Sequence, residues 1–123
     1  MNKYDIVRNY CRFECEPGIE IVIDYVSSGQ QDVDEANVRF LEAKWKDVWP
    51  ATFALLKEMR IRYRFDPDIN PAGMRAKLML ANNVVSETSS WEVSFTVEKD
   101  GYSEWGVAFN GSTIDRSSSQ PYF

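Results

Sequence analysis

Residues 91–109, WEVSFTVEKDGYSEWGVAF, alternate apolar and polar side chains on both sides of a short polar turn. Trp, Val and Phe stand at every second position before the turn, and the same spacing resumes after it. A period of two places these side chains on one face of a strand, and Lys-Asp-Gly at 99–101 has the composition of a tight turn. The stretch therefore predicts a β-hairpin, with Asn110-Gly111 marking the end of its second strand.

The preceding part of the chain contains a long helical pattern that begins near Asp32. Its stripe of core-facing side chains recurs at spacings of three and four residues and comprises Val38, Leu41, Trp45, Val48, Thr52, Leu55 and Met59. Asp32 with Glu35 resembles a capping box, with Asp in place of Ser or Thr. Pro50 lies inside the pattern, and because the stripe keeps its phase across this proline, we predict one kinked, continuous helix.

The N-terminal part predicts a second hairpin over residues 4–26. Apolar and polar side chains alternate on both sides of the turn signal at 16–18, which reads Glu-Pro-Gly. The predicted order of elements is therefore β-β-α-β-β-β, in a single α+β domain that spans residues 1–123. We expect an antiparallel sheet with the long kinked helix packed across one face.

Two segments leave alternatives open, and the C-terminal tail carries no regular pattern. Residues 60–65 alternate as a strand does, but no turn signal separates them from the helix, so helix and strand both remain. Residues 77–85 favour a strand, while a short helix capped by Asn70, with Pro71 at its first position, competes with a strand over 71–82. The Ser-rich tail from Arg116 to Phe123 is predicted to be irregular.

The composition argues against several classes of chemistry. The 123 residues contain no His, which removes Ser-His-Asp and Cys-His catalysis and His-ligated metals. Cys11 and Cys15 would lie about 13 Å apart on one strand face, too far for a disulfide, and no further Cys completes a zinc site. The net charge of −5 disfavours nucleic-acid binding, which depends on cationic contacts with phosphate. We therefore expect a protein without a cofactor or a metal that is not an enzyme.

The N-terminal sequence and the hydropathy favour the cytoplasm. The N-terminus has no apolar run after a basic start, as a secretory signal would. No stretch approaches the roughly 20 apolar residues of a membrane span, so no membrane partner is expected. The acidic balance suits steering toward a basic partner.

Two groups of carboxylates are candidate sites. Residues 66–70, Asp-Pro-Asp-Ile-Asn, contain ligand types for a hard cation, although an EF-hand spacing is absent and a surface turn is the simpler interpretation. Glu92, Glu98 and Glu104 lie on the C-terminal hairpin, so two of them are expected to be neighbours. They form either a general acid–base pair or part of a solvated sheet face.

The candidate partner-binding residues are mostly basic or aromatic. Segment 57–77 contains six basic and three acidic residues, a net charge of +3 within an acidic chain. It suits an acidic partner or a phosphate, or it is a solvated edge that discourages strand pairing. The four Trp residues fall on predicted inward faces, whereas Tyr and Arg elsewhere match the composition of binding hot spots. The predicted partner-binding residues are Tyr102, Glu104, Arg60, Arg62, Arg64 and Tyr122.

Three stretches of the C-terminal hairpin form a distinctive pattern: Trp91–Phe95, Asp100–Tyr102 and Trp105–Gly111. This pattern resembles small bacterial proteins of unknown function and immunity proteins of contact-dependent or polymorphic toxin systems. Some of those proteins carry a Cys or His within this hairpin, and this chain does not. The resemblance implies a small, acidic, cytosolic protein that masks a toxin.

Functions of two different classes are compatible with these features. The first is a protein-binding module, an immunity-type inhibitor that masks a basic toxin domain. The alternative is a small-ligand-binding protein or a carboxylate-based enzyme with a pocket between sheet and helix. Homodimerisation through an exposed strand edge is a further possibility.

Overall fold

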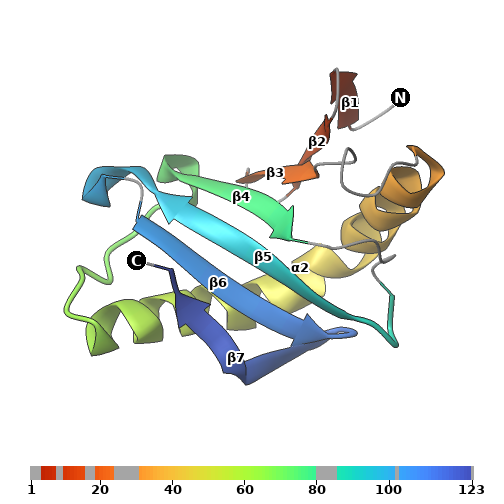
Figure 1. Ribbon diagram of the computed structural model, residues 1–123. Helices are drawn as coiled ribbons and strands as arrows, with labels where there is room; N and C mark the ends of the chain where they lie inside the picture. The colour runs from red at the N-terminus through yellow and green to blue at the C-terminus, as the bar shows by residue number, and fades with distance from the viewer. Residues whose placement is uncertain are drawn as a thin grey trace.

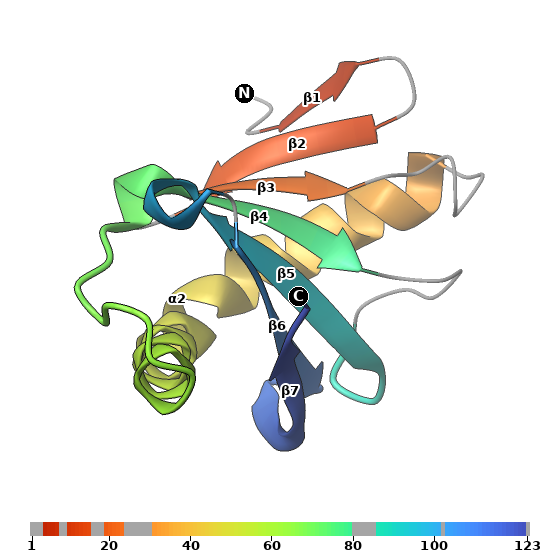
Figure 2. The same cartoon turned by 60° about the vertical axis from the view of Figure 1, so that its left-hand side comes forward.

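The computed structural model describes residues 4–7, 10–15, 19–23, 31–79, 86–101 and 103–122. The strands are β1 (Tyr4–Val7), β2 (Tyr10–Cys15), β3 (Ile19–Ile23), β4 (Met74–Met79), β5 (Ser90–Val97), β6 (Ser103–Asn110) and β7 (Thr113–Pro121). Helix α2 spans Gln31–Arg62, and two 3-10 turns, η1 (Pro71–Gly73) and η2 (Glu98–Asp100), flank β4 and β5. The helix crosses one face of the sheet (Figures 1 and 2), so the predicted α+β class is confirmed.

The strands lie side by side in the order in which they occur in the chain. Neighbouring strands are antiparallel except for β3 and β4, which run parallel with Ile21 opposite Ala76. Parallel neighbours need a long crossover connection, and α2 lies between these two strands in the chain. The helix is therefore the crossover that joins β1–β3 to the meander of β4–β7.

The predicted order β-β-α-β-β-β is only roughly matched. Within the described residues, three strands precede α2 and four follow it. The first arm of the N-terminal hairpin is divided into β1 and β2, with Val7 opposite Tyr10. The tail that was predicted to be irregular forms β7, because Asn110 and Gly111 lead into a tight turn instead of ending the sheet. Gly111 has a φ of 59°, which glycine adopts without strain.

The ambiguous segment after the helix contains both predicted elements in succession. Asn70 caps η1, since its Oδ1 accepts a hydrogen bond from the Ala72 N–H at 3.0 Å, and Pro71 is the first residue of this turn. β4 then begins directly at Met74. The strand predicted over 77–85 thus starts earlier than expected, and its residues after Met79 lie outside the described part.

Helix α2 continues through the strand-like run and ends at Arg62. The end is a Schellman motif, in which the Phe65 N–H donates to the Arg60 carbonyl at 2.7 Å and the Arg64 N–H donates to the Ile61 carbonyl at 3.1 Å. Arg64 has a φ of 65° and occupies the left-handed position where glycine is usual. The strand alternative for residues 60–65 is therefore wrong. The end of the helix could not be predicted from the sequence because Arg64, and not a glycine, occupies the left-handed position.

Arg64→Gly is expected to raise the free energy of unfolding by about 0.5–1 kcal/mol. An L side chain is strained in the left-handed conformation, and glycine relieves that strain by more than its own entropic disadvantage. Urea unfolding followed by circular dichroism measures the change. Arg62→Gly, inside the last helical turn, is the matched control and should lower stability by a similar amount. A destabilised Arg64→Gly variant would show that the arginine makes contacts that outweigh its strain.

The helix passes through Pro50 without interruption, as predicted. Pro50 is exposed, so its ring does not displace core side chains. Two residues later, the buried Thr52 Oγ1 donates to the Val48 carbonyl at 2.7 Å. The one hydroxyl in the core-facing stripe is thus satisfied within the helix.

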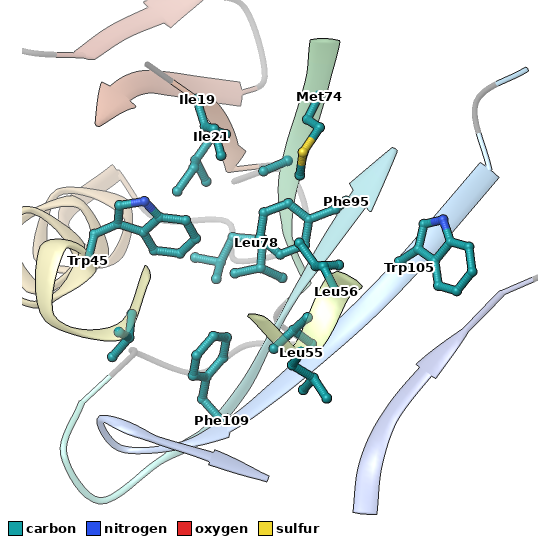
Figure 3. Close-up of a cluster of buried hydrophobic side chains, with 14 of the residues drawn as sticks. Ile19, Ile21, Trp45, Leu55, Leu56, Met74, Leu78, Phe95, Trp105 and Phe109 are labelled. Atoms are coloured by element: carbon teal, nitrogen blue, oxygen red, sulfur yellow. The ribbon is translucent and has the colours of Figure 1, made fainter. Parts of the chain in front are cut away.

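The core fills the space between α2 and the sheet (Figure 3). It contains Ile19, Ile21, Leu41, Trp45, Val48, Leu55, Leu56, Met59, Ile69, Met74, Ala76, Leu78, Trp91, Val93, Phe95, Val97, Trp105, Val107 and Phe109. Trp91 and Phe109 stack with ring centroids 4.1 Å apart. Trp45, Trp91 and Trp105 are buried and Trp49 is half-buried, which confirms the predicted inward faces. This packing commits one face of the sheet to the helix and leaves the other face open.

Candidate functional site

The face of the sheet opposite α2 carries small and polar side chains. They alternate along β5 and β6 with the buried apolar residues that pack against α2, so they point away from the helix. Across the two strands Glu92 lies opposite Ala108, Ser94 opposite Gly106, and Thr96 opposite Glu104. The hairpin predicted from the sequence thus places two of its three carboxylates on one face, while Glu98 lies beyond β5 in η2 and is exposed.

Tyr122 lies across this open face immediately after β7. Its hydroxyl donates a hydrogen bond to the Glu92 carboxylate, and its backbone N–H donates to the Glu104 carbonyl at 2.9 Å. Gly106 lies beneath the ring, and a Cβ atom at this position would overlap both the Tyr122 ring and a Glu92 carboxylate oxygen. The absence of a side chain at Gly106 therefore allows Tyr122 and Glu92 to meet on the sheet. Glu104 and Tyr122, two predicted partner-binding residues, are brought together here.

The two carboxylates of this face have hydroxyl partners. Ser94, which is buried, donates a hydrogen bond from its Oγ to Glu104 Oε1 at 2.7 Å. The Tyr122 hydroxyl donates a hydrogen bond to the Glu92 carboxylate. Among the ion pairs between described residues, none involves either carboxylate. Both therefore keep their charge available to an outside cation. We call Glu92, Ser94, Glu104 and Tyr122 the carboxylate–tyrosine cluster.

The pKa of Tyr122 is expected to fall toward its ordinary value in Glu92→Gln. The hydrogen bond to Glu92 raises the pKa of Tyr122 above 10.0, and burial and the charges of Glu92 and Glu104 act in the same direction. Glu92→Gln removes the charge repulsion from Glu92 and weakens the hydrogen bond that the Tyr122 hydroxyl donates at this position. Ultraviolet difference titration of the wild type and the variant, with Tyr122→Phe to identify the Tyr122 signal, measures the shift. An unchanged titration would place the Tyr122 hydroxyl away from Glu92 in solution.

Arg60, predicted as a partner-binding residue on a basic surface, is instead part of the core. Its side chain is fully buried, with Nη1 2.5 Å from Asp100 Oδ2 and Nε donating to the Asp66 carbonyl at 2.6 Å. The guanidinium also lies 5.4 Å from the Phe65 ring centroid and 5.5 Å from that of Trp105. The sequence interpretation is corrected here because one carboxylate and two aromatic rings enclose this arginine.

Arg62 and Arg64 are exposed, as predicted, at the end of α2. They alternate with Ile61 and Tyr63, whose side chains are 62% and 45% exposed. Tyr63 makes an edge contact with Trp105, with ring centroids 6.3 Å apart. Residues 61–64 therefore form a second surface, separate from the carboxylate–tyrosine cluster, which we call the helix-end surface.

The loop 66–70 that was considered as a cation site is occupied by a cation of the protein itself. Lys99 Nζ lies 3.0 Å from Asp66 Oδ2 and also donates to the Asp68 carbonyl. The Asp68 N–H donates to Asp66 Oδ1 at 2.9 Å, and this bond, followed by the bond from Lys99, lowers the pKa of Asp66. No group of three or more His, Cys, Asp or Glu within the described ranges is placed to hold a metal ion.

A depression of about 550 Å³ adjoins this loop at the end of the sheet. It is lined by Asp68, Ile69, Asn70, Gly73, Val97, Glu98 and Lys99. It opens beside η2 and not between sheet and helix, where the ligand-binding alternative requires a pocket. This depression therefore gives that alternative no support.

Tyr102, the remaining predicted partner-binding residue, lies outside the described residues. The sequence interpretation missed Ser94 and Gly106, although their small size at facing positions of the hairpin was a usable signal. It also missed Ile61 and Tyr63, because their exposure follows from the end of the helix, which was not assigned.

Among the described residues, no helix is long and apolar enough to cross a membrane. Comparisons with protein-family models, with curated proteins and with solved structures found no match.

Proposed function

We propose that the protein binds another protein, and that it acts in the cytoplasm as an immunity-type inhibitor of a basic toxin domain. The observation that supports this proposal is the carboxylate–tyrosine cluster on the open face of the sheet. Tyr122 is 39% exposed there, between two carboxylates that have no basic partner among the described residues. Exposed tyrosine beside available charge is typical of interface hot spots.

The cluster is suited to receive Lys or Arg side chains of a partner. The Glu92 and Glu104 carboxylates already accept hydrogen bonds from Tyr122 and Ser94, which fix their positions before a partner arrives. Fixed carboxylates lose little side-chain entropy on binding. The net charge of −5 attracts a basic protein at long range and raises its association rate.

The same face also contains a basic strip that would orient the partner. Arg75 and Lys77 on β4 are exposed and lie opposite Thr96 and Ser94 on β5. Acidic positions on β5 and β6 therefore stand beside basic positions on β4. A partner with the complementary arrangement binds in one orientation, because the reversed orientation places like charges together.

Affinity capture from the native lysate with three purified baits tests the proposal. The baits are the wild type, Glu92→Gln/Glu104→Gln, and a control, Glu42→Gln/Asp47→Asn, which removes two negative charges from the exposed face of α2. We expect the wild type and the control to retain one basic protein at low salt, and the cluster variant to retain at least about tenfold less. The captured protein should arrest growth when expressed alone, and co-expression with the wild type should restore growth.

Two outcomes separate the parts of the proposal. Equal capture by all three baits would move the binding surface away from the cluster. A captured partner without toxicity would leave protein binding in place and exclude the immunity role.

A further inference from the structure

The helix-end surface exposes part of two large apolar side chains. Ile61 and Tyr63 are 62% and 45% exposed, and they lie within three residues of one another in the chain. Single exposed apolar residues are common on protein surfaces. Two large ones at one helix end, alternating with two exposed arginines, have instead the composition of a binding hot spot.

The backbone beneath these side chains is fixed by several contacts. The Schellman hydrogen bonds close the helix end, and the Phe65 ring packs edge-on against Trp105 with centroids 5.1 Å apart. Arg60, one residue before the surface, is anchored by Asp100 and by the Asp66 carbonyl. A partner that binds here therefore meets a surface whose backbone is already ordered, which reduces the entropic cost of association.

The charges of Arg62 and Arg64 are not used by the neighbouring carboxylates. Asp66 pairs with Lys99, Asp100 pairs with Arg60, and Glu58 on the last turns of α2 pairs with Arg116 of β7. No ion pair between described residues involves Arg62 or Arg64. The helix end therefore carries two available positive charges in a protein whose net charge is −5.

Stabilisation of the helix terminus explains only part of this arrangement. Basic side chains in the last turn interact favourably with the carbonyl end of a helix, which accounts for a cation at Arg62. It does not account for the exposure of Ile61 and Tyr63. It also does not account for an arginine at a left-handed position that glycine would occupy without strain.

We propose that the helix-end surface is a second docking site, which takes an acidic segment of another protein. Carboxylates of the segment pair with Arg62 and Arg64, and an apolar side chain of the segment covers Ile61 and Tyr63. Arginine binds carboxylates in a planar, two-bonded geometry, which favours Asp or Glu over a diffuse negative field. The site shares no residue with the carboxylate–tyrosine cluster, and the charge that it recognises has the opposite sign.

Two synthetic peptides of equal length test this site on the full-length protein. One alternates Glu with Leu and Phe, and the other has Lys in place of each Glu. In ¹⁵N–¹H correlation spectra, we expect the acidic peptide to shift the amide signals of residues 61–65 with a Kd of roughly tens to hundreds of micromolar. Fluorescence anisotropy gives the affinity for each variant.

The variants separate the contributions of charge and apolar contact. Arg62→Gln/Arg64→Gln and, separately, Ile61→Ser should each weaken binding of the acidic peptide by about tenfold. The control Arg39→Gln/Lys46→Gln removes the same charge from exposed positions of α2 and should stay within about twofold of the wild type. Circular dichroism checks that every variant is folded. Equal binding by the Arg62/Arg64 variant, equal binding of the Lys peptide, or amide shifts confined to other regions would each overturn the proposal.

Discussion

Asp100→Asn is expected to lower the free energy of unfolding by about 3 kcal/mol, although the substitution scarcely changes the shape of the side chain. The reason is Arg60, whose side chain is 0% exposed and whose Nη1 lies 2.5 Å from Asp100 Oδ2. Neither Nη1 nor Nη2 has a hydrogen-bond partner among the described residues. The ion pair with Asp100 is therefore the interaction that compensates this buried charge. Urea unfolding followed by tryptophan fluorescence measures the loss.

The double variant Arg60→Met/Asp100→Asn should be more stable than Asp100→Asn alone. Methionine fills the space between Phe65 and Trp105 without a charge, and a buried ion pair can often be replaced by apolar groups at little cost. The exposed pair between Arg116 and Glu58 is the control, and Glu58→Gln should cost less than about 1 kcal/mol. If Asp100→Asn and Glu58→Gln lowered the free energy of unfolding equally, water would have to reach the Arg60 guanidinium.

The same pair predicts how stability depends on pH. The guanidinium of Arg60 lowers the pKa of Asp100 below 3.8, against a smaller opposing effect of burial. The folded state therefore binds the proton less readily than the unfolded state does. This stabilisation is fully present above the ordinary pKa of Asp100 and is lost as pH falls through the lowered value. In Asp100→Asn, the decline of stability at acidic pH should be correspondingly shallower.

Gly111→Ala is expected to cost about 3 kcal/mol or more, whereas Gly101→Ala should cost only about 1 kcal/mol. Both glycines adopt left-handed backbone, with φ of 59° and 69°. Their surroundings differ, because a Cβ at Gly111 would overlap the Glu87 carbonyl oxygen and one at Gly101 would meet nothing within 4 Å. Gly101 therefore measures the conformational penalty alone.

The contacts of Gly111 make relief of the overlap difficult. Its N–H donates to the Ser89 carbonyl at 2.9 Å, and its own carbonyl accepts from the buried Trp91 Nε1 at 2.8 Å. Moving the backbone to admit a methyl group stretches both bonds. Thermal unfolding of the two variants compares the losses of stability directly. Equal losses would mean that residues 86–89 move aside for the methyl group at little cost in free energy.

Much of the fold follows from the period of two and the helical stripe. Alternation in 91–109 was enough to pair β5 with β6 and to place Glu92 and Glu104 on one face. The spacing predicts the helix, and α2 continues through Pro50 because buried side chains on both sides of the proline hold it against the core. These elements could be predicted from the sequence because the spacing of their apolar side chains repeats over many residues.

The rest depended on contacts between distant segments. A charged side chain is normally exposed, and nothing near Arg60 in the sequence indicates that Phe65, Asp100 and Trp105 enclose it. The Ser-rich β7 also lacked a strand pattern.

β7 is held in part by its own polar bonds. Ser117 and Ser118 donate to the Asp115 carboxylate, and Ser119 donates to the Asp115 carbonyl. These bonds bridge an irregularity in the pairing with β6, between Gly106 and Ala108. Because Tyr122 follows β7, the carboxylate–tyrosine cluster could not be assembled from the sequence alone.

The parallel register between β3 and β4 has a consequence for synthesis of the chain on the ribosome. β1–β3 leave the exit tunnel first, but β3 lacks its neighbour until the whole crossover and β4 have followed. The strands β5, β6 and β7 each pair with the strand before them, so the meander β4–β7 closes over short chain distances and should form quickly once synthesised. We therefore expect the last step of folding to be the joining of the earliest-made strands to the latest-made ones, with the N-terminal edge waiting unpaired in the nascent chain.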